Sequence, residues 1–146
     1  MPSVVVPNQG LLELATVMLS VGDGPFSYIV DLYANNYGPN AFSTPADFVV
    51  CTFPGYVPIT VDRSLMNMSL EEGNFVQSSY ANNPIGWGNA WNSTTTVYGY
   101  LVRSTATGNV LWAQAFDVPY VLESGKHIFL TLELQVYPFI NYTPPN

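Results

Sequence analysis

The sequence predicts a mainly β protein: a single-domain antiparallel β-sandwich of jelly-roll or immunoglobulin-like type, with one N-terminal helix and one short helix near residues 45–51. The chain is rich in residues that favour strands, with 10 Tyr, 8 Phe and 3 Trp. Short apolar segments alternate with clusters of Gly, Pro and Asn, which are typical of turns. Residues 128–136 alternate between aliphatic and other side chains, as in a strand with one buried face.

The two helices are predicted from their first residues. Asn8 is a suitable N-cap for a helix that runs to Leu19, because apolar residues recur there at helical spacing. Thr44 is the expected N-cap of the second helix, and Pro45 suits its first position. The second helix must be short, because Pro54 follows it closely.

Strands are predicted where β-branched and aromatic residues gather between turn clusters. They span residues 26–34, 56–62, 75–80, 85–87, 95–103, 110–116 and 128–136. A hairpin loop at 104–109 joins two of them, and Asp117-Val118-Pro119 should end the second. The alternation within the last strand places Leu132 in the core and Thr131 on the opposite face.

The two ends of the chain, residues 1–7 and 138–146, are expected to be extended arms that could reach neighbouring subunits. The first residues lack the basic and long apolar regions of a secretory signal, which favours synthesis in the cytoplasm without that route of export. No apolar run approaches the ~18 residues of a membrane span.

Charge is scarce in this chain of 146 residues, a length that suits one domain, 1–146. Charged residues make up 9% of it, against about a quarter in an average protein, and the net charge is −7. A nucleic-acid-binding surface needs many basic side chains, and an anionic membrane attracts them. We therefore expect neither partner, and a neutral surface that is suited to protein contacts.

The side chains that usually perform catalysis are also few. His127 is the only histidine and Cys51 the only cysteine, so a zinc site and a catalytic triad are not expected. Glu71 and Glu72 are adjacent, whereas a glycosidase needs two carboxylates facing each other across a bond. The sequence therefore predicts a protein that is not an enzyme and needs no cofactor, with Cys51 as a buried thiol.

Aromatic side chains outside the expected core are the candidate binding residues. The candidate contact surface consists of Trp87, Trp91, Tyr56, Tyr137 and Tyr142. Trp112, within a predicted central strand, is expected in the core instead. Tyr56, Trp87, Trp91 and Tyr100 could also form a platform for stacking sugar rings, which leaves a carbohydrate-binding module as an alternative.

Several segments occur in an order that is itself informative. They are Asn8-x-Gly10, IVDLYANN at 29–36, ADF at 46–48, TFPGY at 52–56, VYGYLV at 97–102 and GNVLWAQAF at 108–116. In this order the chain resembles small virion-associated structural proteins of tailed bacteriophages over most of residues 8–136.

The resemblance implies a virion component without enzymatic activity. We expect a capsid decoration or cement subunit that binds the major capsid protein and forms a homo-oligomer, with a trimer preferred. A tail or baseplate accessory protein and the carbohydrate-binding β-sandwich module are the alternatives.

Overall fold

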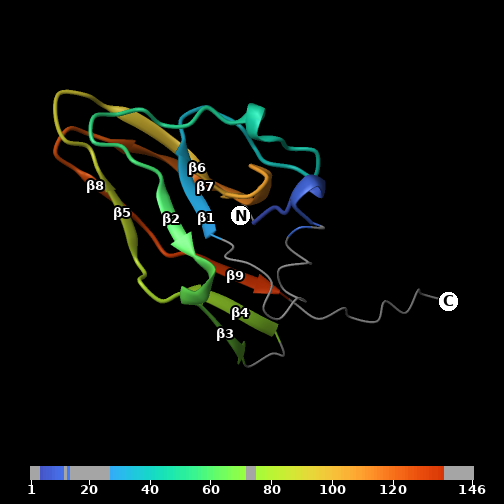
Figure 1. Ribbon diagram of the computed structural model, residues 1–146. Helices are drawn as coiled ribbons and strands as arrows, with labels where there is room; N and C mark the ends of the chain where they lie inside the picture. Colours follow the sequence, from blue (N-terminus) through green and yellow to red (C-terminus); the bar gives the residue numbers. More distant parts are fainter. Residues whose placement is uncertain (1–3, 12, 14–26, 72–74, 137–146) are drawn as a thin grey trace.

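The computed structural model describes residues 4–11, 13, 27–71 and 75–136; for residues 68–71, 75–77 and 134–136 it describes the backbone only. The strands in this part form antiparallel sheets of four, three and two strands (Figure 1). The prediction of a mainly β, antiparallel protein is therefore confirmed. The sheets are not closed.

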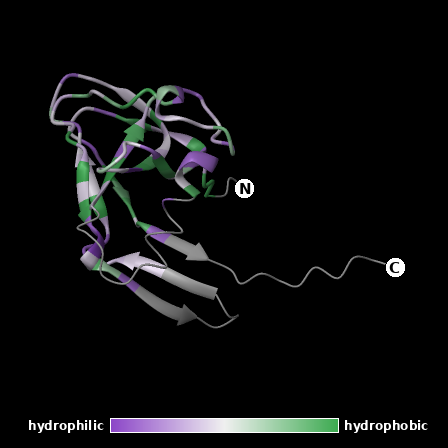
Figure 2. Cartoon of the chain, turned by 45° about the vertical axis from the view of Figure 1, so that its right-hand side comes forward, coloured by the Kyte–Doolittle hydropathy of each residue, from purple (hydrophilic) through white to green (hydrophobic). Residues whose placement is uncertain are grey.

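The four-stranded sheet is the centre of the fold. Its strands are β1 (Ser27–Tyr33), β2 (Ile59–Asp62), β6 (Thr95–Ser104) and β7 (Val110–Leu122), in the order β2-β1-β6-β7. Hydrophobic residues gather on the strands, whereas the loops mix hydrophobic and hydrophilic residues (Figure 2). Val30, Val102 and Trp112 belong to the larger of two buried clusters, and Trp112 is only 1% exposed. The prediction that Trp112 lies in the core is confirmed.

The other two sheets are parts of one bent ribbon. They contain β3 (Met66–Glu71), β4 (Phe75–Tyr80), β9 (Glu133–Val136), β5 (Ile85–Gly88) and β8 (His127–Leu130). β4 pairs with β9 and β5 pairs with β8, so the ribbon continues from one sheet into the other. At the bend, the Asn83 side chain donates to the Leu132 carbonyl at 3.1 Å and accepts from the Leu132 amide at 3.0 Å.

This bend corrects the prediction of one strand over 128–136. Thr131 and Leu132 lie between β8 and β9, where the Asn83 side chain bonds both backbone groups of Leu132 and the Tyr80 amide also donates to the Leu132 carbonyl at 3.2 Å. The alternation of faces nevertheless holds, because Leu132 is fully buried and Thr131 is exposed. The assignment of these two residues to opposite faces is confirmed.

Strand bounds differ from the prediction in three further places. β2 begins at Ile59 rather than at 56, and β3 was not predicted at all. β7 continues through 117–119 to Leu122 instead of ending there. Val97 pairs with Tyr120 and Gly99 with Ala115, so residues 116–119 bulge out opposite a single residue. Proline is tolerated in such a bulge because it needs no ladder partner.

The second of the two predicted helices is shorter than predicted. Residues 8–11 and 13 are helical, and the rest of the predicted helix lies outside the described residues. The second helix is a single 3₁₀ turn, η1 (Pro45–Asp47), in place of a helix near 45–51. The Thr44 amide donates to the Asp47 carboxylate at 2.8 Å, which supports its start. It ends because the chain then pairs with the edge of β1, where the Ala34 amide donates to the Val49 carbonyl at 2.7 Å.

The first arm packs on its own chain. Val5 and Ala113 exchange two backbone hydrogen bonds, of 2.8 and 2.9 Å, beside β7. Val4 and Val6 are partly buried against the core. Residues 4–7 are therefore extended and lie against their own chain, while residues 1–3 and 138–146 lie outside the described residues.

The buried position of Leu132 leads to a stability prediction. Leu132→Ala should lower the free energy of unfolding by about 2–5 kcal/mol, because it leaves a cavity in the core. Thr131→Ala is the matched control and should cost well under about 1 kcal/mol, because this side chain is exposed. Urea denaturation measures both values, and equal losses would contradict this assignment of faces.

Candidate functional site

A buried carboxylate organises the open edge of β1. Asp31 is fully buried and forms an ion pair with Arg103, whose Nε donates to Asp31 Oδ2 at 3.1 Å. The Tyr56 hydroxyl donates to Asp31 Oδ1 at 2.7 Å and accepts from the Leu32 amide at 3.0 Å. A charged side chain in an interior needs such partners, because burial removes its hydration. The contacts tie the loop before β2 to the central sheet.

The predicted contact surface does not form as one unit. Trp87 is 4% exposed, and its indole Nε1 donates to the Val57 carbonyl at 3.0 Å, so the expectation that it lies on a contact surface is wrong. Tyr56 is half-buried and its hydroxyl is engaged with Asp31. Trp91 is 67% exposed. Tyr137 and Tyr142 lie outside the described residues.

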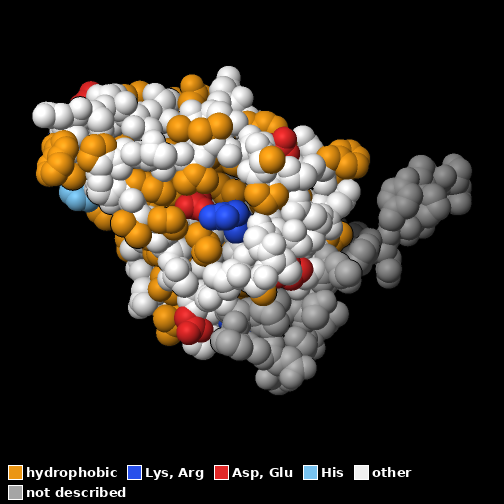
Figure 3. Space-filling view, turned by 45° about the horizontal axis from the view of Figure 1, so that its top comes forward, with side chains coloured by type: hydrophobic (Ala, Val, Ile, Leu, Met, Phe, Trp, Pro, Cys, Tyr) orange, Lys and Arg blue, Asp and Glu red, His pale blue; other side chains and the backbone are white. Residues whose placement is uncertain are grey.

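An aromatic patch that the sequence did not reveal lies on the outer side of β8. We define it by Tyr120, His127 and Phe129. The rings of His127 and Phe129 stack with 6.1 Å between centroids, and the Tyr120 hydroxyl donates to the His127 carbonyl at 3.4 Å. Phe129 is 66% exposed and Tyr120 42%. Hydrophobic side chains lie next to the single histidine on the face that Figure 3 shows.

Two glycines make room for this patch. The opposing strand β5 has Gly86 across from Phe129 and Gly88 across from His127. A Cβ atom at Gly86 would lie 2.7 Å from the Phe129 ring, and one at Gly88 would lie 2.8 Å from the His127 ring. Neither distance is sterically possible without a shift. The glycines therefore let both rings lie flat across the two-stranded sheet, which yields a broad aromatic surface.

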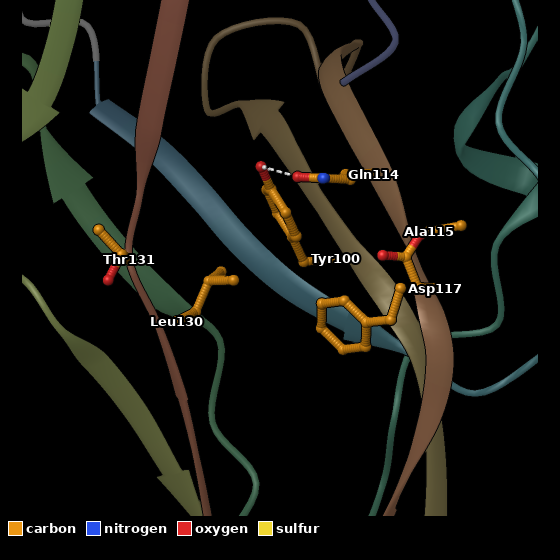
Figure 4. A pocket seen from close by; sticks show the side chains of 7 residues that line it. Tyr100, Gln114, Ala115, Asp117, Leu130 and Thr131 are labelled. Atoms are coloured by element: carbon orange, nitrogen blue, oxygen red, sulfur yellow. Dashed lines mark hydrogen bonds between the residues drawn. The ribbon is translucent and has the colours of Figure 1, made fainter. Parts of the chain in front are cut away.

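A pocket of about 320 Å³ opens between the four-stranded sheet and the bend of the ribbon (Figure 4). It is lined by Tyr100, Gln114, Ala115, Phe116, Asp117, Leu130 and Thr131. One wall comes from β6 and β7 and the other from the junction of β8 and β9. The Tyr100 hydroxyl points toward Gln114 and donates to its Oε1 at 3.3 Å. Of these residues, the sequence indicated only Tyr100 as a candidate binding residue.

Burial shifts the ionisation of several groups toward their neutral forms. It raises the pKa of the Cys51 thiol to about 12, and the nearby Asp31 carboxylate adds to the shift. Burial also raises the pKa values of Tyr33 and Tyr100 to about 12 each. Cys51 is 1% exposed, so the prediction of a buried thiol is confirmed.

Comparisons with known proteins add no relative. No protein-family model matches the chain, and no curated protein matches it significantly. Within the described part of the chain, no group of three or more metal-binding side chains comes together, and no helix there is long and apolar enough to cross a membrane.

The ion pair leads to a second stability prediction. Arg103→Met should lower the free energy of unfolding by about 3–5 kcal/mol, because it leaves the Asp31 carboxylate buried without its cation. Lys126→Met removes an exposed cation and serves as the control, with an expected change within about 0.5 kcal/mol. Thermal and urea denaturation measure both. A loss below about 1 kcal/mol for Arg103→Met would contradict the assigned role of the pair.

The raised pKa of Cys51 leads to a third prediction. The native protein should not react with a thiol reagent such as DTNB at pH 8, because the buried group stays in its neutral form. The pKa of Cys51 is higher in the folded protein than the unfolded value of 9.0. The contribution of this thiol to the free energy of unfolding is therefore fully present below pH 9 and is lost as the pH rises toward 12. If DTNB labelled Cys51 in the native protein at pH 8 about as fast as in urea, this prediction would be contradicted.

Proposed function

We propose that this protein is a non-enzymatic structural component of a phage virion, a β-sandwich subunit that decorates or cements the capsid by binding the major capsid protein. The proposal rests on the resemblance of its ordered segments to virion proteins of tailed bacteriophages. Those segments form the middle of the fold, since 29–36 contains most of β1 and 108–116 contains the first half of β7.

The aromatic patch is the single structural observation that supports this function best. Exposed aromatic side chains are enriched at the centres of protein interfaces, where they bury a large area at a small cost in side-chain entropy. The patch has a firm base, because β5 and β8 pair along their whole length beneath it. A rigid surface loses little conformational entropy on binding, which favours a lasting contact.

The charge of the chain indicates the kind of surface that the patch binds. With 10 acidic and 3 basic side chains and a net charge of −7, the chain favours a neutral or basic partner surface over an acidic one. A capsid offers the same partner surface many times, so each subunit that binds only the assembled shell stabilises it by mass action. We propose a homo-oligomer, with a trimer as the preferred state, at symmetric positions on that shell.

The stoichiometry and location of this chain in purified particles test the proposed function. We expect many copies per particle that remain with the heads when heads and tails are separated. A few copies that remain with the tails would instead support a tail or baseplate accessory protein. Absence of the chain from purified particles would overturn the virion proposal altogether.

The patch itself is tested by adding back variants to particles that lack this chain. Phe129→Ser should lower occupancy by about tenfold or more, because an aromatic anchor at an interface is worth over 1 kcal/mol. Phe42→Ser is the matched control, because Phe42 is 82% exposed in the loop between β1 and η1. Figure 1 shows this loop on the opposite side of the view from β8. Equal losses for both variants, or none for Phe129→Ser, would contradict this role of the patch.

A further inference from the structure

The pocket in Figure 4 results from two irregularities that face each other. On one side, the bulge at 116–119 widens β7, so that Phe116 and Asp117 line the pocket rather than pair with β6. On the other side, the bend between β8 and β9 leaves Leu130 and Thr131 along the opposite wall. Both irregularities interrupt otherwise regular strands, and bulges of this kind often re-aim side chains at binding sites.

The lining combines apolar surface with groups that donate and accept hydrogen bonds. Phe116 and Leu130 supply the apolar part, while Gln114 and Asp117 supply an amide and a carboxylate. The Thr131 side chain points away from the other lining side chains (Figure 4). The Tyr100 hydroxyl is protonated at neutral pH and donates to Gln114 Oε1 at 3.3 Å. A ligand with several hydroxyl groups on an otherwise apolar ring matches this mixture, because it can use both kinds of surface.

Charge and size restrict the ligand further. The lining holds one carboxylate and no cationic side chain, and the chain carries a net charge of −7, so an anionic ligand is disfavoured. A volume of about 320 Å³ is at the lower end of the range for small-molecule sites. It suits a single sugar ring rather than a nucleotide or a long lipid chain.

We propose that this pocket binds one neutral hexose unit, as a free sugar or as the end of a glycan. The apolar side chains Phe116 and Leu130 contact the C–H surfaces of the sugar ring. The polar groups of Gln114 and Asp117 hydrogen bond with its hydroxyl groups. This site differs from the stacking platform expected from the sequence, because Trp87 is buried and neither Trp91 nor Tyr56 lines the pocket.

Titration of the full chain with glucose, galactose and N-acetylglucosamine, followed by amide NMR, tests the proposal. We expect saturable shifts at the lining residues, with a dissociation constant in the millimolar range for at least one sugar. The matching trisaccharides distinguish the two sources: equal affinity indicates recognition of a single unit, and clearly tighter binding indicates a glycan end. Absence of saturable shifts with all of these probes would overturn the proposal.

Variants then locate the site. Gln114→Met should weaken binding about fivefold, because it keeps the length of the side chain and removes a hydrogen-bonding amide. Thr60→Val is the remote control, because Thr60 is exposed on β2, at the opposite edge of the four-stranded sheet from β7. Loss of binding in Trp91→Ala together with full binding in Gln114→Met would overturn the assignment to this pocket.

A charge test separates a sugar from an amine. Asp117→Asn keeps hydrogen-bonding groups at this position, so sugar binding should fall by less than about tenfold. Methylamine, tested as the competing ligand, would depend on the carboxylate charge. Saturable methylamine binding that Asp117→Asn abolishes, with no sugar binding, would overturn the proposal. These results do not depend on the capsid-binding function, which is tested separately through particle composition.

Discussion

The buried Asp31 carboxylate is the constraint on which the rest of this structure depends. A carboxylate deprived of water must be matched by a cation and by hydrogen-bond donors, or the fold that buries it is strongly disfavoured. Here Arg103 comes from the neighbouring strand β6, and the Tyr56 hydroxyl comes from the loop before β2. The contacts of the Asp31 carboxylate therefore link β1, β6 and the loop before β2 at one point.

This requirement explains how the edge of β1 is completed. β2 pairs with the first half of the strand, from Ser27 to Val30. Beyond Val30, the Tyr56 hydroxyl accepts a hydrogen bond from the Leu32 amide, and the Cys51 amide donates to the Leu32 carbonyl at 2.9 Å. β7 lies at the opposite edge of this sheet from β2. The aromatic patch and the pocket both use residues of β7 and β8.

The sequence allowed prediction of features that depend on neighbours along the chain. The alternation around Leu132 identified its buried face, and the apolar setting of Trp112 identified a core residue. Contacts between distant residues could not be read in this way, because Asp31 and Arg103 are 72 positions apart and their pairing follows from strand order. Trp87 was misjudged because its glycine neighbours suggested exposure, whereas its indole reaches the Val57 carbonyl. The pocket depends on the bulge at 116–119 in β7. The sequence did not predict this bulge, because Pro119 suggested that the strand ends there.

Amide hydrogen exchange in Tyr56→Phe tests most directly whether the Asp31 cluster holds the loop against β1. This variant removes only the hydroxyl that links the Asp31 carboxylate to the Leu32 amide. We expect faster exchange at the amides of Leu32, Ala34 and Cys51, with amides in the paired parts of β6 and β7 unchanged. Unchanged exchange at Leu32 and Cys51, or equal acceleration across the central sheet, would contradict this account.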